Sequence, residues 1–269
     1  IAAGIVLSRA IVRDLHGQNE AASMIGYVTM GMALVPMIAP SIGGALDELF
    51  GWQAVFVFLA LSGAAVAAIL WADQGETAAS TGTPFAEQVR DYPELLASPR
   101  FWGYAMATAF ASGAFFAFLG GGPYAASAIY GMSPFWTGIA MGAPAIGYAA
   151  GNFLSGRFSA RAGIERMMLM GAAASSAGMA AAFAVALGGA SHPALLFTFV
   201  TAVGLGNGML IPNATAGMLS VRPHLAGVAS GLGGAIMIGG GAGLSVLAGV
   251  ALEGSQTSAP LSGLMLATS

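Results

Sequence analysis

Met167–Val221 reads MMLMGAAASSAGMAAAFAVALGGASHPALLFTFVTAVGLGNGMLIPNATAGMLSV, and none of its residues is Asp, Glu, Arg or Lys. A helix needs roughly 20 apolar residues to cross a bilayer, so this run is long enough for two crossings. Gly188-Gly189 and the following Ser191-His192-Pro193 are turn-forming residues near its middle. The run therefore predicts a hairpin of two membrane-spanning helices.

The rest of the chain has the same character. Charged residues make up 7% of the 269 residues and hydrophobic residues 57%, with a mean hydropathy of +0.80. Soluble domains are about 25% charged, so this chain could not cover itself with a water-compatible surface. The other charge-free runs are Ala21–Leu46, Leu49–Ala72, Phe101–Gly156 and Pro223–Leu252. The composition predicts an all-α polytopic membrane protein, and a net charge of −3 gives no reason to expect a nucleic-acid partner.

Run lengths and turn signals together predict the individual spans. A capping serine precedes a proline at Ser98-Pro99 and at Ser133-Pro134, which favours helix starts at both places. The glycines of Gly120-Gly121-Gly122-Pro123 predict a turn that ends a span. The predicted spans are 1–12, 22–46, 51–71, 100–120, 134–155, 166–187, 194–216 and 225–251, with 258–269 as the start of another. The chain opens on Ile1 within an apolar run, which we interpret as a truncated sequence.

The arginines test this arrangement. When the spans are laid alternately across the membrane, all eight arginines fall on one side, and the opposite loops hold none. The positive-inside rule makes that side cytoplasmic. Residues 73–99, which hold five of the eleven acidic side chains, then form a cytoplasmic linker. The arginines are Arg9, Arg13, Arg90, Arg100, Arg157, Arg161, Arg166 and Arg222.

Two segments carry features beyond simple membrane spanning. In the first, Pro36 and Pro40 lie on one face of span 22–46 and remove two backbone hydrogen bonds. Ala39 and Gly43, also four residues apart, permit a close helix contact. This pattern fits an ordinary kinked helix or a bent helix at a seam between moving parts.

The second segment is the arginine-dense stretch between spans 134–155 and 166–187. It is predicted as a short cytoplasmic loop and contains Gly156, Arg157, Arg161 and Arg166. Its arginines set the topology, or they form a gate by pairing with carboxylates or helix C-termini in one conformation only.

The chain resembles the Bcr/CflA drug-resistance branch of the major facilitator superfamily. The proline helix resembles the superfamily's antiporter motif, here represented by Gly31, Pro36, Pro40, Gly43 and Gly44, and the arginine stretch resembles its loop between helices 8 and 9. Ala39 stands where the antiporter motif usually has glycine, and Gly156 stands where the loop commonly has Asp. Further matching runs are Leu7–Leu15, Ala21–Met24 and Phe50–Phe56.

The resemblance implies two six-helix bundles around a central cavity, with substrate exposed to each side in turn. Residues 1–72 would end the N-terminal bundle, 73–99 would be the central linker, and 100–269 would hold helices 7 to 11 and the start of helix 12. Helices 1 to 3 and most of helix 4 would be missing. The family exports drugs or small metabolites in exchange for protons, from the bacterial inner membrane. We expect a monomer that needs the lipid bilayer, a small-molecule substrate and protons, and no cofactor or metal.

Polar and aromatic residues inside the spans are the candidates for the substrate cavity. Asn207 stands out because it lies between two glycines of a helix, where its amide can bind substrate or join two helices. No predicted span contains Asp or Glu, so we expect the proton-coupling carboxylate in the missing N-terminal helices. The candidates are Tyr27, Tyr104, Phe115, Tyr148, Asn152 and Asn207.

Two other functions fit parts of the sequence. A passive uniporter on the same fold is the closer alternative, and the sequence of helix 1 would distinguish it. A membrane enzyme is disfavoured, because intramembrane catalysis needs titratable or metal-binding side chains at membrane depth. The predicted spans contain no His, Asp, Glu or Cys.

Overall fold

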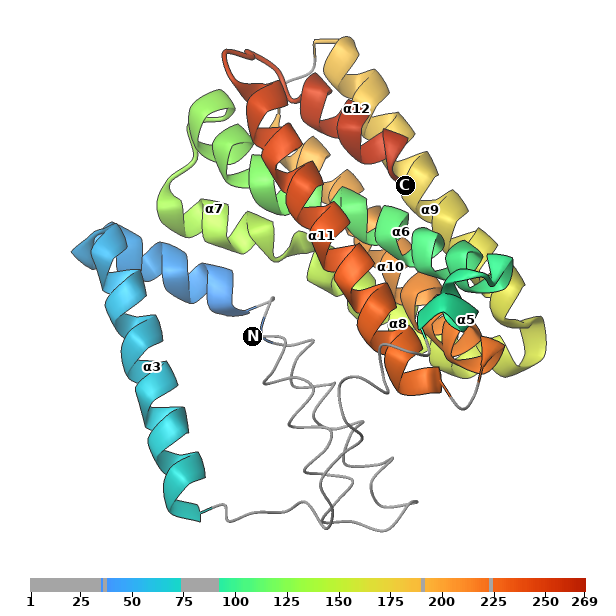
Figure 1. Ribbon diagram of the computed structural model, residues 1–269. Helices are drawn as coiled ribbons and strands as arrows, with labels where there is room; N and C mark the ends of the chain where they lie inside the picture. The colour runs from blue at the N-terminus through green and yellow to red at the C-terminus, as the bar shows by residue number, and fades with distance from the viewer. Residues whose placement is uncertain (1–34, 36–37, 74–91, 190–191, 223–224) are drawn as a thin grey trace.

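The computed structural model describes residues 35, 38–73, 92–189, 192–222 and 225–269, and this part of the chain consists of helices and turns without a strand (Figure 1). Five of its helices are long and apolar enough to cross a membrane. The elements in chain order are a helix over 38–50, α3 (Trp52–Asp73), α5 (Tyr92–Leu96), α6 (Pro99–Tyr124), the π-helix η1 (Ala125–Ile129), α7 (Pro134–Met141), α8 (Ala143–Ala162), α9 (Ile164–Leu187), α10 (Pro193–Val221), α11 (Ala226–Leu252) and α12 (Ala259–Ala267).

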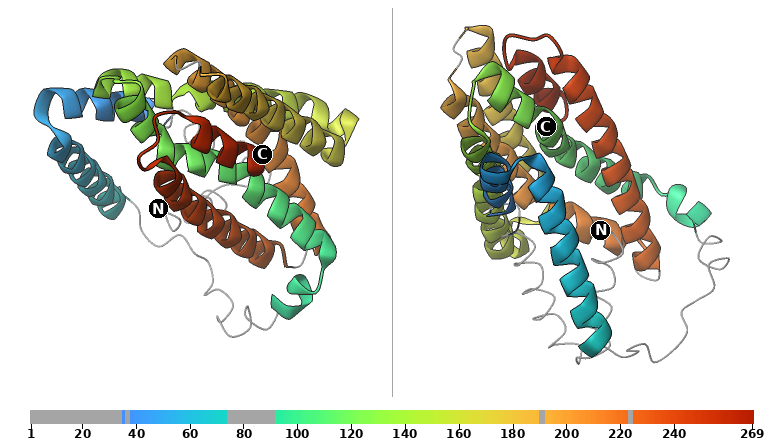
Figure 2. Two further views of the ribbon diagram at one scale, coloured as in Figure 1. Left: turned by 90° about the horizontal axis from the view of Figure 1, so that it is seen from above. Right: turned by 90° about the vertical axis from the view of Figure 1, so that its left-hand side faces the viewer.

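Helices α6 and α8 to α12 pack side by side into one bundle, and α3 stands apart from it (Figures 1 and 2). The apolar side chains of α3 are exposed, and Trp71 near its end is 90% exposed. Such a helix is typical of a membrane span, whose natural surroundings are lipid or other helices. The all-α membrane fold predicted from the sequence is therefore confirmed.

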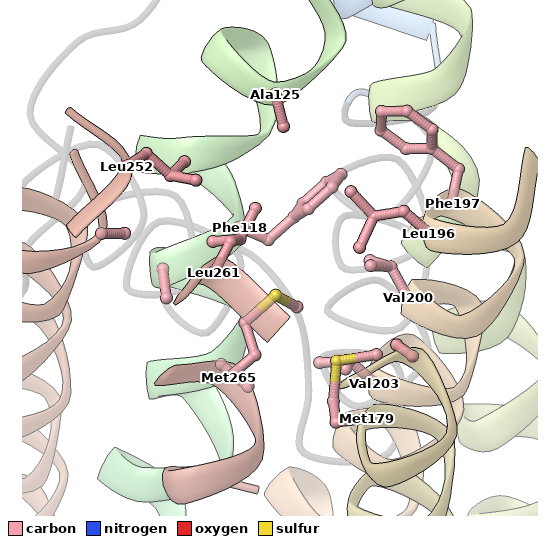
Figure 3. Close-up of a cluster of buried hydrophobic side chains, with 14 of the residues drawn as sticks. Phe118, Ala125, Met179, Leu196, Phe197, Val200, Val203, Leu252, Leu261 and Met265 are labelled. Carbon is pink, nitrogen blue, oxygen red and sulfur yellow. The ribbon is translucent and has the colours of Figure 1, made fainter. Parts of the chain in front are cut away.

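The bundle's core lies where α6, α9, α10, α11 and α12 meet. Phe118 of α6 reaches toward Leu196 and Val200 of α10 (Figure 3), and its ring meets that of Phe197 edge-on at 5.9 Å between centroids. Leu252, Leu261 and Met265 from α11 and α12 complete the same cluster. Alanines such as Ala114, Ala117 and Ala182 lie between these large side chains and let the helices approach closely.

The turn predicted at Gly120-Gly121-Gly122-Pro123 is wrong, because α6 continues to Tyr124. A methyl group on Gly121 would lie 2.8 Å from side-chain atoms of Leu252 and Leu261, so this glycine serves close packing rather than a turn. Pro123 lies inside α6, and the chain then widens into η1. A missing proline N–H accounts for such a widened turn.

The span predicted over 134–155 is divided into α7 and α8, which meet at Gly142. The arginine stretch is also different from its prediction as a loop, because α8 runs on to Ala162 and α9 begins at Ile164. Gly163 alone makes the turn, with a φ of +87° that favours glycine. An arginine-rich sequence forms helix readily, which explains why polarity misled the prediction.

The remaining predicted spans agree with the structure to within a few residues, except that α10 continues through Pro212 to Val221. The expected linker over 73–99 contains α5 and the start of α6 within its last eight residues. Most of span 22–46 and all of span 1–12 lie outside the described residues. The division of the chain into two bundles stays a prediction.

Candidate functional site

Helix 38–50 and α7 approach each other at backbone distance. A methyl group on Gly138 would lie 2.8 Å from the carbonyl carbon of Pro40, and one on Gly44 would lie 3.0 Å from that of Pro134. Glu48 accepts a hydrogen bond from the backbone N–H of Phe135 at 3.2 Å. We call this contact the α7 seam.

The seam uses other residues of the proline helix than expected. Gly43 has open space around it, and Ala39 is exposed. Within the described residues Pro40 and Gly44 make the close contact, and the contact predicted for Ala39 and Gly43 stays a prediction. Helix rotation explains the difference, because adjacent residues point about 100° apart. Gly31 and Pro36 lie outside the described residues.

Helices α8 and α10 run parallel and are even closer together. Methyl groups on Gly147 and Gly204 would overlap the backbone of Thr201 and Pro144 respectively. Gly151 and Gly208 continue the contact one turn further along both helices. Four glycines thus bring the two backbones together over more than one helical turn, as small residues do between membrane helices.

A buried polar contact follows on the same pair of helices. The Asn213 side-chain amide donates to Ser155 Oγ at 2.8 Å and to the backbone carbonyl of Met209 at 2.7 Å. The Ser155 hydroxyl also lies 3.2 Å from that of Ser159. Sequence reasoning missed Asn213, although an asparagine after Pro212 in an otherwise apolar run was a usable signal.

Asn207 is buried inside the bundle. Its side chain is 4% exposed, and its Oδ1 has no hydrogen-bond partner within the described structure. It borders a cavity of about 150 Å³ between α6, α9 and α10, where the Ser175 hydroxyl is also without a partner. Ser269 is a third polar residue of the lining, and the other lining side chains, such as Phe110 and Leu210, are apolar. This arrangement suits a small neutral group or water better than an ion.

The other described cavity candidates are distributed over the bundle. The side-chain amide of Asn152 donates a hydrogen bond to the backbone carbonyl oxygen of Tyr148 at 2.8 Å, within α8. Tyr104 covers Gly217 with its ring, and Phe115 packs on the core cluster. Among these candidates, Asn207 alone lines the cavity described above. Tyr27 lies outside the described residues.

The arginines of the predicted loop lie at the C-terminal end of α8 and at the start of α9. Arg157 and Arg161 are exposed on the last two turns of α8, and Arg166 is exposed at the start of α9. Gly156 is exposed, with open space where a side chain would be. Their role as a gate stays a prediction.

Helix α5 is fastened to the same end of the bundle. Leu95 is completely buried among Phe101, Met218 and neighbouring apolar side chains. Glu94 forms an ion pair with Arg222 at 2.8 Å. We call this contact the α5 clip. The sequence analysis assigned α5 to the linker and missed this contact, because five residues show no helical periodicity.

The comparisons with known proteins agree on one family. The sequence profile described as Major Facilitator Superfamily matches residues 1–246. An "Uncharacterized MFS-type transporter YdgK" from Bacillus subtilis is 29% identical over 99% of this chain and 66% of its own length. A "Bicyclomycin resistance protein homolog" from Haemophilus influenzae is 28% identical over 97% of this chain and 65% of its own length.

A shorter match and a solved structure extend the comparison. "Multidrug transporter MdfA" from Yersinia pestis is 32% identical over 52% of this chain and 34% of its own length. The inward-facing, unoccupied structure of a bacterial homolog to the human lysosomal transporter Spinster has a TM-score of 0.64. It is 19% identical, with 97% of this chain and 70% of that chain covered, which is evidence for the fold alone. The matches to the Bacillus subtilis and Haemophilus influenzae relatives take in nearly all of this chain but only about two thirds of each relative's own length.

Proposed function

The chain belongs to the Major Facilitator Superfamily, and we propose that the protein exports drugs or small metabolites by alternating access in exchange for protons. The membership makes it a multi-pass membrane protein of a transporter family rather than an enzyme, with a bilayer and a small-molecule substrate as its partners. Relatives named for bicyclomycin resistance and multidrug transport fit the Bcr/CflA drug-resistance branch and support drugs as the substrate class.

The α7 seam is the observation that carries the proposal. A transporter of this kind must close one side of its cavity while it opens the other. Helix 38–50 and α7 meet through Pro40, Gly44 and Gly138. The predicted topology puts this contact toward the side of the membrane opposite the arginines. Backbone contact through small residues seals this side tightly. In this proposal the seam is part of the closure on the outer side of the cavity.

The opposite end of α8 would form the cytoplasmic gate. Arg157, Arg161 and Arg166 are exposed there and offer guanidinium groups to acidic partners. Gly156 cannot supply the carboxylate that the superfamily's loop commonly has at this position. The partner carboxylate must then come from another part of the protein, and so must the proton-coupling group. We place the protein as a monomer in the bacterial inner membrane, with the linker over 73–99 in the cytoplasm.

Dye accumulation tests the proposal. The protein, expressed from its complete gene in efflux-deficient bacteria, should lower the accumulation of ethidium or a similar cationic dye relative to the empty vector. A protonophore should abolish that difference. If neither the protein nor the protonophore changed accumulation over a panel of dyes and antibiotics, efflux would be refuted.

A passive uniporter is the second candidate, favoured by the lack of Asp and Glu in the described helical stretches that form the bundle interior. It would equilibrate a solute without concentrating it, and a protonophore would leave its rate unchanged. A pair of glycine exchanges provides a matched control for both functions. Gly44→Val should reduce transport by opening the seam, and Gly63→Val in α3, where no described atom lies within 4 Å, should not.

A further inference from the structure

The helical stretch over residues 134–162 is interrupted at Gly142, between α7 and α8. The Gly142 N–H donates to Ile139 and the Ala145 N–H to Gly142, both at 3.0 Å, so these bonds span three residues instead of four. Pro144 has no N–H to give. Mid-helix segments of this tighter kind often mark hinges.

The two parts of this helix have different partners. In the described chain α7 meets helix 38–50 at backbone distance through Gly138 and Gly44. The Glu48 carboxylate also accepts a hydrogen bond from the backbone N–H of Phe135 in the first turn of α7, a favourable place for a negative charge. Figure 1 shows α7 leaving the line of the bundle toward the helix before α3.

In contrast, α8 is held by α10. Glycines at 147, 151, 204 and 208 leave no room for the two backbones to shift against each other. The bond from Asn213 to Ser155 fixes the register further along the pair. A hinge requires two parts with different attachments. Here α8 is held by α10 on one side of the break, and α7 is attached to helix 38–50 on the other.

We infer that Gly142–Pro144 is a hinge, at which α7 turns together with helix 38–50 while α8 stays with α10. The inference rests on the proposed alternating access for its purpose. Without a hinge, the seam would have to break each time the outer side opened. With a hinge, α7 follows the first part of the protein, and the opening forms between α7 and the rest of the bundle.

Distances between spin labels test the hinge without any need for transport. In the protein expressed from its complete gene and placed in lipid nanodiscs, labels at exposed Ile139 and Phe153 should give a broad or two-peaked distance distribution. Labels at Leu49 and Ile139 should give a single narrow distance. A third pair at Phe153 and Leu195, on the joined helices α8 and α10, is the rigid reference and should also be narrow. One narrow distance between 139 and 153 overturns the hinge.

A proline exchange links the hinge to function. Pro144→Ala restores a backbone N–H, so it should narrow the distribution between 139 and 153 and slow dye efflux about tenfold. Pro99→Ala is the matched control, because Pro99 is in the first turn of α6, where no N–H is needed. A Pro144→Ala protein with an unchanged distribution overturns the inference. Narrowed distances in a protein that exports nothing would refute the proposed function and leave the hinge supported.

Discussion

Gly208→Ala is a direct perturbation of the contact between α8 and α10. The added methyl group would lie 2.5 Å from the carbonyl oxygen of Tyr148, 2.7 Å from the Asn152 backbone nitrogen and 2.9 Å from the Gly151 Cα. Ordinary contact begins near 3.4 Å, so the helices would have to separate by about 0.9 Å. A gap of that size forfeits a quarter to a half of the dispersion attraction along the contact.

The expected cost follows from these distances. Overpacking costs about 1–3 kcal/mol in well-packed cores, and we expect the upper end because all three obstructing atoms belong to the backbone. Gly239→Ala on α11 is the control, since nothing lies within 4 Å of its added methyl group. Alanine there should be neutral or stabilise by up to about 1 kcal/mol through helix propensity.

Reversible unfolding in mixed micelles measures the difference. The purified protein is titrated with SDS while circular dichroism follows the helix content, and the free energy of unfolding is compared between the two variants. We expect the Gly208→Ala protein to be less stable than the Gly239→Ala protein by about 3 kcal/mol. If the two agreed within about 0.5 kcal/mol, the close approach of α8 and α10 would not be what holds them together.

Asn213→Ala removes a buried hydrogen bond between helices and should lower the free energy of unfolding by about 0.6–1.7 kcal/mol in the same titration; a change of zero would make the bond irrelevant. Leu95→Ala should cost about 2–3 kcal/mol because the side chain is completely buried, whereas exposed Leu96→Ala should cost under about 0.5 kcal/mol. A double-mutant cycle with Glu94→Gln and Arg222→Gln should give a coupling below about 1 kcal/mol that shrinks in high salt, because the pair is half exposed. A coupling free energy that stayed constant in molar salt would contradict the description of Glu94 and Arg222 as a solvent-screened ion pair.

The sequence predicted the fold well because length and polarity decide membrane spans. Spans 166–187 and 225–251 match α9 and α11 to within two residues, since charges and turn residues bound them on both sides. The errors arose where one residue type has two uses. Glycines 120–122 were read as a turn, but tertiary packing against Leu252 and Leu261 makes them part of a helix.

The candidate site was harder to predict than the fold. Which face of the proline helix makes the seam depends on helix rotation, and the sequence pattern favoured Gly43 where the structure uses Gly44. The polar link from Asn213 to Ser155 joins residues 58 positions apart, and no local pattern pairs them. Asn207 was predicted to bind substrate or to join two helices; the structure buries it and shows which helices surround it, and its role stays a prediction.

The closeness of α8 and α10 has a consequence for how this protein can diversify. The four glycines on the facing sides of the two helices are constrained by main-chain atoms. A single exchange there cannot be compensated by trimming another side chain, so drift at these positions should be rare. New ligand preferences would have to arise on other surfaces of the same helices, while the contact between α8 and α10 stays the same.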